Sequence, residues 1–282
     1  ADSHLYAWLE AKGIDFDLIT DRELHEEGVD SIRDYKALCT GSHPEYHTPQ
    51  TLDALQNYRD QGGRLVYLGG NGFYWKIALS PEDPELIEIR RGESGIRAWA
   101  AEPGEYYHSF DGSYGGLWRR NGRPPQLLAG VGFSAQGKFE GSYYRRTAES
   151  LAPDLAWMFE GIEDQEILGD FGFSGGGAAG FELDRADVRL GTPEEVSVVA
   201  SSENHTSSFV LVPEEMLTHI TNWPGEEEQQ KLIRSDIVYF RTPSGGEVFS
   251  TGSITFCGSL PWNDFDNNIS RLLENVIRRF LQ

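Results

Sequence analysis

Two loops of this sequence hold polar side chains that could bind a metal ion or transfer a proton. The first, residues 40–48 (Thr-Gly-Ser-His-Pro-Glu-Tyr-His-Thr), contains His43 and Tyr46. The second follows the apolar run 64–68, passes through three glycines and reaches Tyr74. Because the carboxyl ends of neighbouring parallel strands meet at one edge of a sheet, these side chains are expected to share a site. The alternative is that they are ordinary surface or capping groups.

Three further places in the chain carry oxygen or nitrogen donors. Tyr107 and His108 lie in a region rich in glycine and aromatic residues, and Glu203 and Asn204 follow a later predicted strand. Glu182 is flanked by two apolar residues after a glycine cluster. A carboxylate in apolar surroundings is costly unless it is paired or bound to a metal. We therefore expect Glu182 to have a charged partner.

Several common chemistries have no motif in this chain. A nucleophilic serine or cysteine on a sharp strand-to-helix turn is absent, and Cys39 and Cys257 lie within apolar runs. Neither the spacing of a zinc site nor a phosphate-binding glycine loop is present. What remains is a set of phenols, carboxylates and a few histidines. Hard oxygen ligands of this kind favour a hard metal ion such as ferric iron.

The charge and composition of the chain limit its partners. The formal net charge of −21 argues against nucleic acids and anionic membranes, which are themselves polyanions. A neutral or cationic small molecule fits better. The sequence shows no signal peptide and no apolar segment of membrane-spanning length, and its two cysteines suit a reducing compartment. The prediction is a soluble, cytoplasmic protein.

The hydrophobic pattern predicts the fold that must position these residues. Helical and strand-like segments alternate, which favours an α/β fold with a mostly parallel sheet and helices on both faces. The predicted helices are 3–11, 51–61, 150–162 and 267–281, and the predicted strands are 14–19, 35–40, 64–68, 196–200, 237–240 and 248–256. Residues 1–282 are expected to form one domain, in which residues 81–148 are an irregular insertion acting as a lid or pocket wall.

The order of the first two elements suggests that this chain is part of a longer polypeptide. A βαβ unit begins with a strand, but here the first helix leads directly into the predicted strand 14–19. We expect the missing strand to come from residues that precede Ala1.

Five runs of this sequence resemble the C-terminal domain of the N,N-dimethylformamidase large (beta) subunit, and the likeness extends over essentially the whole chain. The runs are residues 40–48, 67–75, 105–109, 115–118 and 130–137. The resemblance implies a class I glutamine-amidotransferase-like fold, an N-terminal β-rich domain in the full subunit, and a small partner subunit in a hetero-oligomer. It also implies hydrolysis of N,N-dimethylformamide and similar small formamides at a mononuclear ferric iron (Fe³⁺) held by two tyrosines and one glutamate.

The resemblance also suggests which residues would do this. Tyr74, Tyr107 and Glu182 meet the order of the ligands, with Tyr46 as the alternate tyrosine. The catalytic candidates are Asn204, which would orient substrate or water, its neighbour Glu203, and His108 or His43, which would move protons. The competing interpretation is a non-catalytic amidotransferase-like domain that serves as a scaffold or small-ligand receptor. A sugar-modifying protein of the related trehalose-utilisation type is a further alternative.

Overall fold

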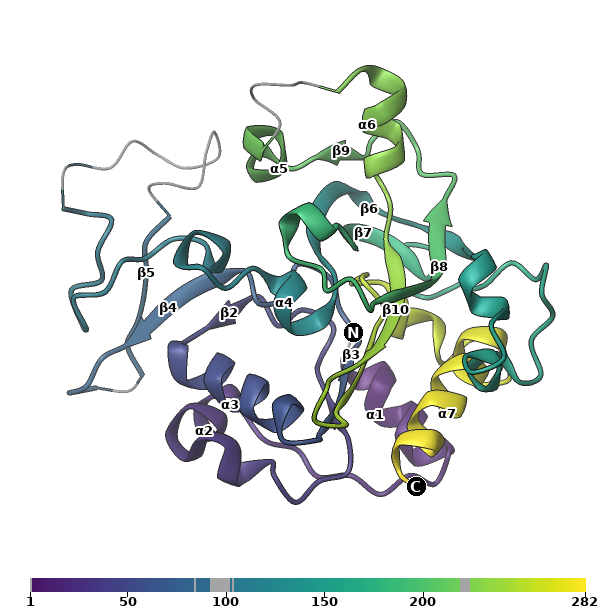
Figure 1. Ribbon diagram of the computed structural model, residues 1–282, viewed down its shortest axis with the longest axis horizontal. Coiled ribbons are helices and arrows are strands. Elements are labelled where there is room, and N and C mark those ends of the chain that lie inside the picture. Colours follow the sequence, from purple (N-terminus) through teal and green to yellow (C-terminus); the bar gives the residue numbers. More distant parts are fainter. Residues whose placement is uncertain (1, 84, 92–101, 103, 219–223) are drawn as a thin grey trace.

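The largest element of the protein is a mixed β-sheet. The computed structural model describes residues 2–83, 85–91, 102, 104–218 and 224–282 (Figure 1). Eight strands form this sheet in the order β1-β3-β11-β10-β8-β6-β7, with β9 paired to β6. Their bounds are β1 Leu38–Cys39, β3 Arg64–Tyr67, β6 Gly132–Arg146, β7 Ala179–Arg185, β8 Ser197–Glu203, β9 Val210–Leu211, β10 Asp236–Arg241 and β11 Glu247–Ser250.

The predicted mostly parallel, glutamine-amidotransferase-like sheet is wrong. Within the described residues, β3 pairs in parallel with β1 and β11, and the other pairings of this sheet are antiparallel. One cause is the short connection between β10 and β11, since so few residues can join only antiparallel neighbours. Another is β6, a strand of 15 residues that pairs with β7, β8 and β9. It lies in the region that was predicted to be irregular.

A second, smaller sheet lies beside the first. It consists of β2 (Tyr46–His47), β4 (Trp75–Leu79) and β5 (Ile87–Ile89), in the order β2-β4-β5. The β2 and β4 strands are parallel, and β4 and β5 are antiparallel. In Figure 1 this sheet extends to the left, away from the main sheet. We call β4, β5 and residues 104–117 the arm.

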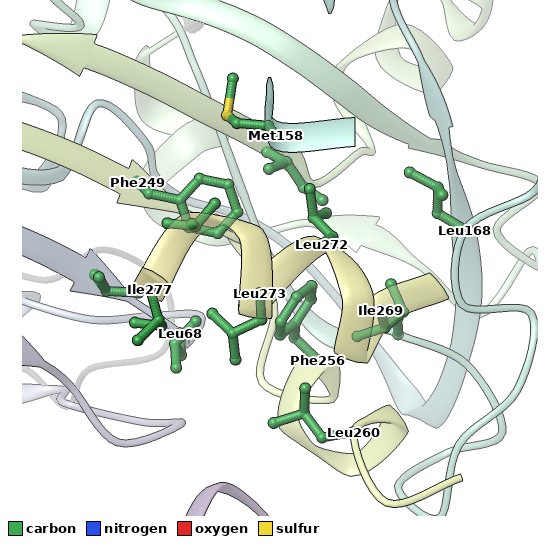
Figure 2. Packing of buried hydrophobic residues seen from close by; sticks show 14 of the residues in the cluster. Leu68, Met158, Leu168, Phe249, Phe256, Leu260, Ile269, Leu272, Leu273 and Ile277 are labelled. Atoms are coloured by element: carbon green, nitrogen blue, oxygen red, sulfur yellow. The ribbon is translucent and has the colours of Figure 1, made fainter. Parts of the chain in front are cut away.

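Helices cover both faces of β3, and the alternation of its side chains explains why. Leu65 and Tyr67 belong to the apolar cluster that contains α3 (Pro49–Asp60), whereas Val66 and Leu68 belong to the cluster of α1 (Asp2–Ala11) and α7 (Asn268–Phe280). The α7 helix packs its apolar stripe against the sheet, as Figure 2 shows for Leu272, Leu273 and Ile277 beside Phe249. A strand that is covered on both faces has a continuous apolar sequence.

The remaining helices are short. They are α2 (Asp21–Glu27), α4 (Pro125–Ala129), α5 (Pro213–Thr218), α6 (Glu226–Leu232) and the 3₁₀ turns Gly28–Ser31, Trp118–Asn121, Ala148–Leu151, Ala156–Phe159, Val188–Leu190 and Phe256–Ser259. No helix in the described ranges is long and apolar enough to cross a membrane.

The predictions for α1, α3, β3, β8, β10 and α7 are confirmed, the predicted strands 35–40 and 248–256 are shorter in the structure (β1 and β11), and two other predictions are wrong. Residues 150–162 form 3₁₀ turns rather than an α-helix, because Pro153 and Gly161 interrupt the helical pattern. Residues 14–19 form neither a helix nor a strand and pair with no described strand. Cys39 and Cys257 are both free thiols.

Candidate functional site

The loop that follows β3 is held against two other segments of the chain by close backbone contacts. A β-carbon on Gly69 would lie 2.5 Å from the carbonyl oxygen of Ser42, and one on Gly70 would lie 2.7 Å from the carbonyl oxygen of Glu182. Only glycine allows such close approach. These glycines therefore bring three distant parts of the sequence together: the loop after β1, the loop after β3, and strand β7.

Residues with unusual backbone angles lie in these same segments. Asn71, Phe73 and Phe181 have φ values of 52°, 54° and 60°. Positive φ is uncommon outside glycine, and for an aromatic residue it costs of order 1 kcal/mol or more. Such strain persists only where the surrounding structure enforces it, and it concentrates at functional sites. Here it adjoins the residues that meet in the cluster described next.

Two carboxylates and an amide converge on one histidine nitrogen. His43 Nε2 lies 3.2 Å from Glu45 Oε2, 3.2 Å from Glu182 Oε2 and 3.4 Å from Asn71 Nδ2. Glu182 is 6% exposed and Asn71 is 3% exposed, whereas the His43 side chain is 37% exposed, so a buried carboxylate and amide meet a histidine that solvent can reach. We call His43, Glu45, Asn71 and Glu182 the His43 cluster.

The carboxylates of the cluster determine the protonation state of His43. Burial alone lowers the pKa of the imidazole, but the hydrogen bonds and negative charges of Glu182 and Glu45 outweigh it and raise the pKa to about 10. His43 is therefore an imidazolium at neutral pH. A protonated Nε2 donates rather than accepts, so its partners are the two carboxylates, and Asn71 Nδ2 at 3.4 Å is a neighbour of the ring and not a donor to it.

A buried hydrogen-bond chain behind the cluster fixes the position of Asn71. The Tyr67 hydroxyl accepts from Gly72 N (2.8 Å) and donates to Asp184 Oδ2 (2.8 Å), while Asn71 N donates to Asp184 Oδ1 (2.7 Å). Burial of Asp184 raises its pKa to about 7, against the opposing effect of these donors. The chain ties the glycine loop to β7, two residues from Glu182.

Two oxygen atoms of the cluster are buried without an ordinary hydrogen-bond donor among the residues that the structure describes. Asn71 Oδ1 is buried and accepts no hydrogen bond from the described residues, and neither does Glu182 Oε2 apart from its ionic contact with His43. Within the described chain, no group of three or more His, Cys, Asp or Glu side chains is arranged to hold a metal by itself. A cation at this place would therefore draw on amide or phenol oxygens as well as carboxylates.

Two of the three predicted tyrosine ligands lie near this cluster. Tyr46, on β2 next to Glu45, is 39% exposed, and its hydroxyl contacts Arg91. Burial and the negative charges of Glu45 and Glu182 raise its pKa. Tyr74 is 2% exposed, and its ring packs edge-on against Phe133, which is paired with Asp184 in the β6–β7 ladder.

Tyr107 and His108 lie in the arm. Tyr107 is 51% exposed and packs edge-on against Tyr114. His108 is buried, with Nδ1 3.5 Å from Ser113 Oγ and 3.8 Å from Asp111 Oδ1, and burial lowers its pKa. No contact among the described residues joins either side chain to the His43 cluster.

Glu203 and Asn204 lie at the end of β8. The Glu203 carboxylate is exposed and pairs with Arg145, and Asn204 is an exposed residue with φ of 62°. The next residue, His205, donates to or accepts from Ser202 Oγ at 2.7 Å and packs against Phe209. Within the described chain, none of these side chains contacts the His43 cluster.

His205 is expected to make the protein sensitive to acid. Burial lowers its pKa to about 4, whereas a histidine in the unfolded chain has a pKa of about 6.5. The unfolded chain therefore binds the extra proton, and stability is fully present above pH 6.5 and lost as the pH falls toward 4. Between about pH 6.5 and 4, we expect the free energy of unfolding of His205→Asn to fall by up to about 3 kcal/mol less than that of the unmodified protein. Urea unfolding of both proteins at pH 7.5, 5.5 and 4.5 measures this free energy. An equal decrease in the two proteins would show that His205 does not cause the sensitivity to acid.

The sequence prediction missed Glu45, Tyr67 and Asp184. Glu45 stands two residues after His43, so the His-Pro-Glu run itself contained the signal for a shared site. Asp184 stands two residues after Glu182, on the same face of a strand, and this period of two could have linked them. Nothing in the sequence indicated that Tyr67 reaches Asp184.

The comparisons with known proteins agree with the runs of sequence noted above. A family model described as "N,N-dimethylformamidase beta subunit-like, C-terminal" matches residues 1–268. The chain is 42% identical to the N,N-dimethylformamidase beta subunit of Paracoccus aminophilus and 41% identical to that of an Alcaligenes species, in each case over all 282 residues. It spans 37% of the length of each of these relatives. The chain therefore belongs to the family formed by the C-terminal part of the N,N-dimethylformamidase beta subunits.

Proposed function

We propose that this chain is the part of an amidohydrolase that carries the proton-transfer groups for hydrolysis of small N-substituted formamides, such as N,N-dimethylformamide, to formate and an amine. The observation that carries the proposal is the convergence of Glu45, Glu182 and Asn71 on His43 Nε2. The relatives named as N,N-dimethylformamidase beta subunits support the choice of substrate. Their name also supports a multi-subunit enzyme, in which this chain is part of one subunit.

The described residues fit a hard metal ion beside His43. Asn71 Oδ1 is buried without a hydrogen-bond donor among the described residues, Glu182 Oε2 is buried beside His43, and Tyr46 and Glu45 are their neighbours. We propose that a mononuclear ferric iron is held by Glu182 and Tyr46, with Glu45 and Tyr74 as the remaining oxygen donors, in preference to Tyr107. When bound, such an ion supplies Lewis acidity that polarises a carbonyl oxygen.

The chain's own residues would manage the protons of the reaction. Amide hydrolysis adds water to the formyl carbon, breaks the C–N bond and transfers one proton from the water to the departing nitrogen. The Glu182 carboxylate can accept a proton from water, and the His43 imidazolium beside it can donate one from Nε2. Asn71 can orient a carbonyl or a water through its amide. Tyr67 and Asp184 keep Asn71 in place.

Iron analysis of matched variants tests the ligand assignment. We expect the purified enzyme to contain about one iron per beta subunit and to show phenolate-to-iron absorption in the visible range, because a ferric ion deprotonates its phenol ligands. Tyr46→Phe should lower both the iron content and this absorption, and Tyr107→Phe, in the arm, should change neither.

Three results would count against this proposal. Iron loss in Tyr107→Phe without iron loss in Tyr46→Phe would show that Tyr107, in the arm, is the ligand. Iron-free enzyme with full activity would exclude the metal but not the His43 cluster. A protein that binds formamides without turning them over would support the scaffold interpretation instead.

A further inference from the structure

The main sheet has a free edge at β1, and an apolar groove runs along it. β1 pairs with β3 on one side and with no described strand on the other, and its two residues are only partly buried, whereas β3 is almost completely buried. A cavity of about 230 Å³ lies beside this edge. Residues 14–19 and 37–41 are among those that line it.

The sequence of residues 14–19 is typical of a β-strand, but no described strand pairs with this segment. Apolar and acidic residues alternate from Ile14 to Leu18, yet this segment is neither helix nor strand. Phe16, Leu18 and Ile19 are 37%, 61% and 37% exposed. Alternation of this kind is typical of a strand with one covered face. The apolar side chains of this segment are therefore exposed to water, and a neighbouring strand would cover part of them.

Both faces of the groove are already covered by apolar side chains. Leu5 and Leu9 of α1 and Ile277 of α7 line one face, and Ile32 and Leu38 line another part of the wall. A strand between two such faces is apolar on both of its own faces, as in a parallel sheet. The groove thus suits a short, nearly continuous run of residues such as valine, isoleucine and leucine.

The position of α1 shows where this strand would end. The Asp2 carboxylate, in the first turn of α1, accepts from Ser42 N and Ser42 Oγ, both at 2.8 Å. Ser42 lies just beyond the carboxyl end of β1. A strand in the groove that runs parallel to β1 would also end there, at the start of α1. This is the arrangement of a βαβ unit, in which the strand feeds directly into its helix.

We propose that one extended apolar segment fills this groove, pairs in parallel with β1, and makes residues 14–19 the outermost strand of the sheet. Its occupant is the segment joined to the N-terminus of α1 in a longer polypeptide, and the relatives described above are long enough to contain one. A second copy of the chain is a poor occupant, because Asp15 and Asp17 at the rim would face their own copies in a molecule of net charge −21. The proposal does not depend on the chemistry of the His43 cluster.

Hydrogen exchange of the native enzyme tests the proposal. The polypeptide isolated from its source, with whatever residues precede Ala1, is compared with the 282-residue chain. In the longer polypeptide, we expect those amides of residues 14–19 and 37–41 that have no hydrogen bond to α1 or β3 to exchange at least tenfold more slowly, because pairing protects them. The amides of α3, which lies outside the groove, should exchange equally in both and report that the fold is unchanged.

Deleting the ten residues that precede Ala1 from the native polypeptide should remove the protection of residues 14–19 and 37–41. Three results would overturn the proposal: a native polypeptide that begins at Ala1, equal exchange at the groove in the native enzyme and the 282-residue chain, or protection that survives the deletion. Protection of the 282-residue chain that grows with its concentration would assign the groove to a second copy and would also overturn it.

Discussion

Replacing Glu182 by glutamine is expected to lower kcat/KM for N,N-dimethylformamide by at least about 100-fold. Glutamine keeps the size of the side chain but removes the negative charge that lies 3.2 Å from His43 Nε2. The variant loses a proton acceptor, and a positioned acid or base contributes roughly 10²–10⁴ to a rate. It should also bind less iron, because a neutral amide is a weaker ligand for a hard cation than a carboxylate.

Glu203→Gln is the matched control for this experiment. Glu203 is also a glutamate on a strand of the main sheet, but its carboxylate is exposed and paired with Arg145. We expect its kcat/KM and iron content to remain within about twofold of the unmodified enzyme, since exposed ion pairs contribute little. Steady-state kinetics and metal analysis of the unmodified enzyme, Glu182→Gln and Glu203→Gln measure kcat/KM and iron content. If Glu182→Gln retained most of its activity, the His43 cluster would not be the catalytic site.

Replacing Gly70 by alanine is expected to destabilise the protein by about 2–3 kcal/mol, the cost of forcing a group into a packed interior. The new methyl group would lie 2.7 Å from the carbonyl oxygen of Glu182 and 3.0 Å from the amide nitrogen of Ile254. Both contacts are with backbone atoms, which cannot rotate away as a flexible side chain can. The loop must therefore move away from β7, and Asn71 moves with it.

A loss of activity larger than the loss of folded protein would distinguish this variant from a simple packing defect. Urea unfolding measures stability, and kcat/KM is measured under conditions where the variant is fully folded. Gly225→Ala is the control, because Gly225 has φ of −62° and no described residue lies within 4 Å of an added β-carbon. Because Gly225 is the N-cap of α6, we expect that change to cost about 0.5–1 kcal/mol, less than the change at Gly70. Equal effects at both positions would show that the contact with β7 is not tight.

The sequence predicted well those elements whose pattern is local. The apolar residues of α7 recur at helical spacing, and the apolar run of β3 lies between glycines, so both elements could be located from nearby residues alone. The direction of strand pairing is not local. It depends on which strands become neighbours, and the 15 residues of β6 include three glycines and several charged residues, a composition that resembles a loop.

The same distinction applies to the site. Glu182 could be singled out because a carboxylate between apolar residues needs a partner, and His43 because its loop follows a strand. Their meeting could not be predicted, since it depends on how closely Gly69 and Gly70 let three segments approach. Tyr107 was preferred over Tyr46 because its region was expected to cover the pocket. In the structure, that region forms the arm, and Tyr46 lies beside Glu45.

The parallel pairing of β3 with β11 has a consequence for the order of events in folding. Residues 64–67 pair with residues 247–250, so most of the chain must be enclosed in one loop before this pairing can form. Closing long loops costs entropy that is recovered only when the contacts are complete, and such pairings form slowly. β3 leads directly into the glycine loop that carries Asn71, while the residues after β11 contact that loop through Ile254. On refolding, helix content should therefore return well before catalytic activity, and activity marks the last step of assembly rather than an early one.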